Sequence, residues 1–500
     1  MSNIPENNTK GQQGSYRSIF KATTLFGGVQ IYQIIISVIK SKFVAVLLGP
    51  FGVGIQGLYT SALELVQTIT KMGLLQSAVR DVSEANGSGQ QERINTVVSV
   101  LRKLVWITGL LGMISVIVFS PVLSKTTFGD QYHIIAFIIL SVTLLLSQLN
   151  DGQLVVLQGL RRLKDLAKAS AIGTTLGLFI SVPLFYFFGV DGIVPSLVIS
   201  AFTTFALSWY FAHKVKIEKV KVGIKQALQE GRGMLGMGIA MSVSNILITL
   251  CAYVLRGVIR HCDGAEMVGL YTAGFTIITT YFSMIFTAMA TDYYPRLAAV
   301  NNDNAECRRL SNEQGEVASL IMTPLVLICI VFMPLILWIL YSDKFLEAND
   351  FIFWAVLGMM FKLASWVIAF QFIAKKETKI FIINESLLNA YTLGLSLLGY
   401  KLGGLVGLGV AFTASNFLYL VQVYVVARYK YGYSFTKAFR NLYLIQYLLI
   451  IVAAIIALIC GKVMTYCLGT LIIILSCIFS LRELDKRMNI LQIIKNRKKN

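Results

Sequence analysis

Charged residues are scarce in this sequence of 500 residues: 14% are Asp, Glu, Lys or Arg, whereas 56% are hydrophobic. A soluble protein of this composition could not cover its surface with polar side chains. Many apolar runs reach about 20 residues, the length that a helix needs to cross a bilayer. The sequence therefore predicts an all-α protein that crosses the membrane many times.

Metal ligands and nucleotide-binding motifs are also few. There are three His and seven Cys, with no CxxC, and most of the Cys lie in apolar runs where a small hydrophobic side chain is expected. No GxxxxGK[ST] phosphate loop occurs, and the longest polar loops have about 20 residues, too few for an ATPase domain. We expect no metal and no bound cofactor, and leave coupling to H⁺ or Na⁺ open.

The apolar runs form fourteen candidate spans. Their approximate limits are 20–48, 52–80, 104–123, 132–160, 167–189, 193–213, 234–260, 267–293, 317–341, 350–374, 379–400, 403–427, 443–461 and 463–481. The polar residues 1–17 are expected to form a disordered tail before a full-length span, which differs from a cleavable signal peptide. Very few residues join the last two spans, so a re-entrant hairpin is an alternative there.

Basic residues distribute unevenly around these spans. If the N-terminus is cytoplasmic, 34 of the 44 Lys and Arg fall in the tails and inner loops, five in the outer loops and five inside spans. Cytoplasmic loops of membrane proteins carry such an excess. The bias predicts that both termini are cytoplasmic. It also accounts for the net charge of +19 without nucleic acid as a partner, although the basic flanks could contact anionic lipid.

The chain contains an internal repeat. Gly57-Leu58-Tyr59-Thr60 recurs 212 positions later as Gly269-Leu270-Tyr271-Thr272, and Gly192-Ile193-Val194 corresponds to Gly404-Leu405-Val406 at the same shift. The shift also superimposes polar stripes at helical spacing. Gln30, Gln33 and Ser37 correspond to Ser242, Asn245 and Thr249, and Glu64 corresponds to Thr276.

Six spans separate the repeats, so both would enter the membrane from the same side as parallel repeats, with a transport site between them. The predicted organisation has six parts: a cytoplasmic tail 1–17, an N-lobe 18–213, a cytoplasmic linker 214–230, a C-lobe 231–427, an extra span pair 428–481 and a basic cytoplasmic tail 482–500.

Several charges lie inside spans, where each costs roughly 2.5–3.5 kcal/mol to insert. We predict four substrate-binding cations in a central cavity: Lys40, Lys71, Arg256 and Lys362. The polar residues predicted to line it are Gln30, Gln33, Asn245, Thr249 and Thr276. Three acids, Glu64, Asp151 and Glu385, could pair with these cations or bind a coupling ion. Cations beside polar side chains suit a polyprenyl-diphosphate-linked sugar chain.

Three stretches resemble Wzx-type oligosaccharide flippases: LLGPFGVGIQGLYTSALELVQTITKMGLLQSAVRDVSE from Leu47, VGLYTAG from Val268 with YYPRLA from Tyr293, and LQGLRR from Leu157. That superfamily includes multidrug and toxin extrusion (MATE) transporters and the lipid II flippase MurJ. The resemblance implies two six-helix bundles in a V that open alternately to each side of the bacterial inner membrane.

By the same resemblance, the substrate would be an undecaprenyl-diphosphate-linked O-antigen or capsule repeat unit, and the partners a polysaccharide polymerase and glycosyltransferases. An extra span pair at 443–481 departs from the twelve spans of many members. A cation-coupled multidrug exporter of the same fold is the main alternative. A membrane polymerase or ligase is a further one, although the outer loops are too short to hold an obvious catalytic constellation.

Overall fold

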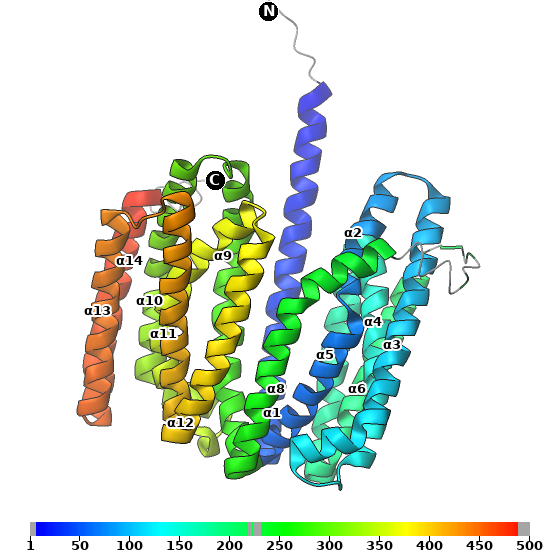
Figure 1. Ribbon diagram of the computed structural model, residues 1–500, viewed down its shortest axis with the longest axis horizontal. Helices are drawn as coiled ribbons and strands as arrows, with labels where there is room; N and C mark the ends of the chain where they lie inside the picture. Colours follow the sequence, from blue (N-terminus) through cyan, green and yellow to red (C-terminus); the bar gives the residue numbers. More distant parts are fainter. Residues whose placement is uncertain (1–6, 216, 219, 221–222, 224–231, 489–500) are drawn as a thin grey trace, which may run out of the picture. The chain divides into compact units, whose positions relative to one another are not determined.

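The computed structural model describes residues 7–215, 217, 218, 220, 223 and 232–488, and within these ranges the chain is helical, with no strand (Figure 1). It divides into two compact units, Met1–Glu266 and Met267–Asn500. The predicted all-α membrane fold is confirmed. This division falls after Glu266, whereas the predicted lobe boundary lies in the linker 214–230.

The first unit contains seven α-helices and one 3-10 turn among the described residues. They are α1 (Asn7–Lys71), α2 (Leu74–Gly87), α3 (Gln91–Phe128), α4 (Ile134–Gly159), α5 (Leu163–Phe188), η1 (Gly189–Gly192), α6 (Ile193–His213) and most of α8 (Arg232–Thr276). Helix α1 begins at Asn7, so residues 7–17 are helical rather than a disordered tail. No proline interrupts the stretch from Asn7 to Gly49, so the helix of the first span continues through the polar residues.

The second unit begins in the last turns of α8. It continues with the π-helical turn η2 (Ile277–Tyr281), α9 (Phe282–Ala299), α10 (Asn304–Leu340), the 3-10 turn η3 (Asp343–Phe345), α11 (Ala348–Ala374), α12 (Thr378–Tyr431), α13 (Lys437–Ile459) and α14 (Lys462–Met488).

Among the described residues, ten helical segments are long and apolar enough to cross a membrane. Four of them, Tyr32–Lys71, Leu163–His213, Asn245–Thr287 and Thr378–Tyr431, have 40 to 54 residues. At 1.5 Å per residue, each would extend about 60 Å or more, twice the hydrocarbon thickness. Each of the four also contains a glycine with a non-helical backbone, so each can make two passes. Counting them twice gives fourteen passes, and that number stays a prediction.

These glycine turns repeat along the chain. Gly49 (φ 64°, ψ −172°) and Gly264 (φ 87°, ψ −179°) share one conformation, and Gly189 (φ 55°, ψ −130°) and Gly404 (φ 54°, ψ −131°) share another. All four have a positive φ, which costs a side-chain-bearing residue free energy but is readily adopted by glycine. Each pair is 215 positions apart, so the duplicated chain turns back at equivalent points.

A non-glycine turn repeats at the same shift. Arg161, between α4 and α5, and Lys376, between α11 and α12, have φ values of 55° and 59°. The amide of Arg161 donates to the carbonyl of Gln158, and the amide of Lys376 donates to that of Ile373, both at 3.0 Å. The ends of α4 and α11 are therefore closed by equivalent backbone hydrogen bonds.

The backbone register corrects one predicted correspondence. Gly404 has the backbone conformation of Gly189, so it corresponds to Gly189 and not to Gly192. The residue that corresponds to Gly192 is Gly407. A Cβ on Gly192 would overlap the carbonyl of Leu184, and one on Gly407 would overlap that of Gly399. The Gly57 and Gly269 motifs keep their shift of 212, because three fewer residues separate the second motif from its turn glycine.

The repeated Gly-Leu-Tyr-Thr motif is a packing motif in both units. In the first, Tyr59 is buried, its ring lies 4.8 Å from that of Phe128, and its hydroxyl bonds Nδ1 of His133 at 2.6 Å. In the second, Tyr271 is buried 5.3 Å from the ring of Phe351.

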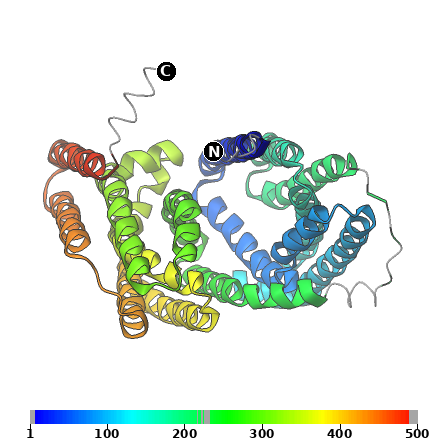
Figure 2. The same cartoon turned by 90° about the horizontal axis from the view of Figure 1, so that it is seen from above.

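The extra span pair docks against α10, at the edge of the second unit (Figures 1 and 2). Asn312 of α10 joins the segment before α13 through both ends of its amide: Nδ2 donates to the carbonyl of Ser434 at 3.2 Å, and Oδ1 accepts from the amide of Thr436 at 2.9 Å. Gly315 lies under the ring of Phe439, and Gly469 lies against Val331. Both α13 and α14 are long enough to cross the membrane.

Filling the glycine contact should loosen this docking. A Cβ at Gly469 would lie 2.5 Å from a methyl group of Val331, whereas one at Gly461 would meet nothing within 4 Å. We expect Gly469→Val to destabilise the protein by about 1–3 kcal/mol through overpacking, and Gly461→Ala to change stability by less than about 0.5 kcal/mol. Thermal unfolding in detergent measures both, and equal melting temperatures for the two variants would contradict the packing.

Candidate functional site

The four predicted cavity cations lie on three helices: Lys40 and Lys71 on α1, Arg256 on α8 and Lys362 on α11. Each is half-buried. Their surroundings within each unit differ, and these differences decide which charges are free to meet a ligand.

Lys71 is held by an acid. It is the last residue of α1, where Met72 and Gly73 turn the chain with positive φ values. Its ammonium lies 2.7 Å from Oδ2 of Asp151 on α4, and the amide of Asn150 donates to the other carboxylate oxygen at 3.1 Å. The side chains of Lys71 and Asp151 are 23% and 32% exposed. Two residues predicted separately thus form one ion pair, the structural alternative that the sequence left open.

Lys362 belongs to a cluster in the second unit. Its ammonium lies 5.9 Å from the centre of the Phe412 ring, and it interacts electrostatically with Glu385 of α12. The hydroxyl of Tyr419 donates to Oε1 of Glu385 at 2.5 Å. The nearby hydroxyl of Tyr391 is buried without a hydrogen-bond partner among the described residues. This cluster therefore brings a cation, an acid and two phenols together from α11 and α12.

The guanidinium of Arg256 has fewer hydrogen-bonding partners among the described residues than the ammonium of Lys71 has. Helix α8 is fixed to the end of α3 by Tyr253, whose hydroxyl bonds the hydroxyls of Thr126 at 2.6 Å and Thr127 at 2.9 Å. One turn further, Nε of Arg256 is buried, and within the described ranges it has no hydrogen-bond partner; Nε of Arg260 is in the same situation. A guanidinium in this state is suited to an incoming anion.

Two of the five polar residues predicted to line the cavity are hydrogen-bonded to their own helices. The hydroxyl of Thr249 donates to the carbonyl of Asn245 at 2.9 Å, and that of Thr276 to the carbonyl of Thr272 at 2.7 Å. Such back-bonding needs no ligand. The Asn245 side chain is exposed and that of Gln33 is half-buried, whereas the side chain of Gln30 lies outside the described residues.

Glu64 and Lys40 stand apart from the pairs. Glu64 is exposed, and no hydrogen bond or ion pair joins it to another described side chain. Lys40 likewise has no ion pair within the described part of the chain. Both are therefore available to a solute or an ion.

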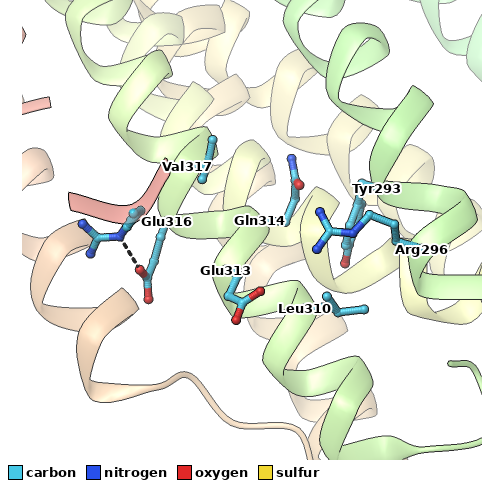
Figure 3. Close-up of a pocket in the computed structure, with 8 residues that line it drawn as sticks. Tyr293, Arg296, Leu310, Glu313, Gln314, Glu316 and Val317 are labelled. Carbon is cyan, nitrogen blue, oxygen red and sulfur yellow. Dashed lines mark hydrogen bonds and ion pairs between the residues drawn. The ribbon is translucent and has the colours of Figure 1, made fainter. Parts of the chain in front are cut away.

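The second unit contains a pocket that the sequence did not predict. Two residues of the YYPRLA stretch form part of its wall. This pocket of about 530 Å³ is lined by Tyr293 and Arg296 of α9, and by residues of α10 and Arg487 of α14 (Figure 3). Arg487 donates to Glu316 at 2.8 Å across its edge. Only tertiary packing brings these three helices together, since the residues are spread over nearly 200 positions.

Known proteins resemble this chain in sequence and in fold. A sequence profile for the family described as polysaccharide biosynthesis protein matches residues 43–350. A Shigella flexneri protein provisionally named an O-antigen transporter is 24% identical over 328 residues, which cover 63% of this chain and 75% of that protein.

Two solved structures share the fold. The lipid II flippase MurJ, in an inward closed conformation, has a TM-score of 0.69 and 14% identity over 94% of this chain and 99% of its own. An inward-facing multidrug resistance MATE family transporter of the MOP superfamily has a TM-score of 0.67 and 15% identity over 82% of this chain and 96% of its own.

Breaking the Lys71–Asp151 pair should destabilise the first unit. Asp151→Asn or Lys71→Met leaves one half-buried partner uncompensated, and we expect each to cost about 1–3 kcal/mol, between the values for exposed and fully buried pairs. The double variant Lys71→Met with Asp151→Asn should cost less than the sum of the two single variants. Unfolding in detergent measures this coupling.

The exposed Arg309 on α10, which pairs with both Glu306 and Glu313, serves as the control. Arg309→Gln should change stability far less. If the Lys71 and Asp151 effects simply add, the pair contributes no stability and both groups are free for other roles.

Proposed function

Because this chain belongs to the polysaccharide biosynthesis protein family, we propose that it moves oligosaccharides linked to a polyprenyl diphosphate from one leaflet of the membrane to the other. The family match over residues 43–350 carries this proposal, and it confirms the resemblance to Wzx-type flippases. The chain is a transporter with a multi-pass helical fold. Drug export is supported by the fold of the MATE neighbours alone.

The chemistry of the described residues supports this substrate class. A diphosphate needs cationic donors, and Arg256 carries a buried Nε that has no partner among the described residues. Lys40 has no ion pair in the same ranges, whereas Lys71 is already held by Asp151. We therefore assign diphosphate binding to Arg256 and Lys40 before Lys71.

We further propose the bacterial cytoplasmic membrane as the location, with both termini cytoplasmic, on the strength of the charge bias of the loops. The sugar would be an O-antigen or capsule repeat unit built by glycosyltransferases and joined by a polymerase. A reporter that is active only outside the cytoplasm, fused in the loop 214–232, should stay inactive, and strong activity there would overturn this orientation.

A reconstituted assay tests the activity. The protein is placed in vesicles with a fluorescent polyprenyl-diphosphate oligosaccharide, and an impermeant quencher reports how fast the label crosses. Vesicles with the protein should equilibrate the label, and protein-free vesicles should not. Arg256→Gln should slow crossing about 10-fold or more, because a charge-assisted bond is lost, while Arg256→Lys retains part of the rate.

The control is Arg93→Gln, which removes an equally charged group paired with Glu84 outside the predicted spans. No crossing by the unaltered protein would refute the activity itself. Crossing that is unaffected by Arg256→Gln would refute only the assigned role of Arg256.

We propose that an ion gradient drives the step through Glu64, because this exposed carboxylate has no partner among the described residues while Asp151 is held by Lys71. In the same vesicles, an imposed H⁺ or Na⁺ gradient should speed crossing by the unaltered protein. Glu64→Gln keeps the shape and removes the charge, so the dependence on the gradient should disappear. A gradient response that persists in this variant would exclude Glu64 as the coupling group.

A further inference from the structure

A second pocket lies on the first unit, away from the predicted cavity residues. It encloses about 290 Å³ between α3, α4 and α6, and its polar lining comprises Arg102, Trp106, Gln153, Trp209 and His213. Gly152 of α4 forms part of the wall, where the close approach of Val105 leaves no room for a side chain. None of the predicted cavity cations or acids lines this pocket.

Two polar atoms in this pocket have no hydrogen-bond partner among the described residues. Nε of Arg102 and Oε1 of Gln153 are buried from solvent, and neither has a hydrogen-bond partner within the described part of the chain. No described acid forms an ion pair with Arg102. A buried donor or acceptor left unpaired costs roughly 1–3 kcal/mol, more when it is charged. An anion beside the guanidinium and a donor beside the amide oxygen would satisfy both groups.

The rim of the pocket is aromatic and open. Trp106 and Trp209 are 49% and 47% exposed, and the Trp209 ring lies 4.2 Å from the ring of His213. Tryptophan is enriched where a membrane protein meets the lipid headgroups, since its indole is apolar with one polar N–H. Beyond His213, the ammonium of Lys214 lies 4.3 Å from the centre of the Tyr210 ring and adds positive charge at this level.

Exposed apolar side chains continue from the rim along both outer helices. On α3, Leu110 and Ile114 follow Trp106 at intervals of four residues, and both are exposed. On α6, Phe202 precedes Trp209 by two helical turns and is 59% exposed. The headgroup-level pocket thus opens onto two apolar tracks that run toward the middle of the spans, as acyl chains would.

We propose that this pocket, which we call the α3–α4–α6 pocket, binds the headgroup of a membrane glycerophospholipid. The phosphodiester accepts hydrogen bonds from the Arg102 guanidinium, which matches phosphate geometry with several donors. A hydroxyl or ammonium of the same headgroup donates to Oε1 of Gln153. Phosphatidylglycerol and phosphatidylethanolamine both carry such a donor, whereas phosphatidylcholine does not.

The test measures lipid binding and does not depend on transport. The full-length protein, purified in detergent and stripped of lipid, is titrated with phosphatidylglycerol, and native mass spectrometry follows the fraction that carries one lipid. Arg102→Gln should weaken this binding about 10-fold. Lys103→Gln is the matched control, because it removes the same charge from the adjacent residue, which does not line the pocket. Its affinity should be unchanged.

Gln153→Leu supplies a second arm, since it removes the acceptor and should reduce the preference for phosphatidylglycerol over phosphatidylcholine. Each variant's melting temperature is compared with that of the unaltered protein, so that loss of binding is not confused with loss of folding. Equal binding by Arg102→Gln and the unaltered protein, or equal loss in Lys103→Gln, would overturn the proposal. Displacement of the lipid by an equal concentration of inorganic phosphate would instead identify a site for a soluble anion.

Discussion

Lipid offers no hydrogen-bond partner to a backbone N–H or C=O group, and this constraint governs the rest of the structure. Each apolar run has to satisfy its own backbone as a helix, and the chain has to reverse within very few residues. The left-handed conformations of Gly49, Gly189, Gly264 and Gly404 make these reversals inside long helical segments. Their repetition at one interval shows that the two repeats reverse direction at equivalent points.

The charged side chains inside the spans do not follow the internal repeat. Within the described ranges, Lys71 meets Asp151 and Lys362 lies near Glu385, each pairing confined to one unit and made by different helices. Neither pairing has a counterpart at the repeat interval. The scaffold is therefore duplicated whereas its ionic chemistry is not. Arg256, whose buried Nε has no partner in the described part of the chain, is left as the better candidate for an anionic ligand.

The sequence predicted what depends on composition and local period, and missed what depends on packing between distant helices. Apolar runs of bilayer length predicted the helices, and the motifs that begin at Gly57 and Gly269 predicted the repeat. The shift of 215 could not be recognised from the sequence, because the turn glycines are related by their backbone conformation and not by a shared sequence motif. Helical periodicity places Lys71 and Asp151 on faces of their own helices, but it cannot tell which faces meet. The α3–α4–α6 pocket was hidden for the same reason.

The docking of α13 and α14 has a mechanical consequence. Three residues of α10 hold this pair of helices. Asn312 forms hydrogen bonds to the segment before α13, Gly315 contacts the ring of Phe439, and Glu316 forms a salt bridge with Arg487 of α14. We therefore expect the three helices to move together. Spectroscopic labels on α10 and α14 would form an internal ruler of constant length, against which displacement of other parts of the transporter could be calibrated.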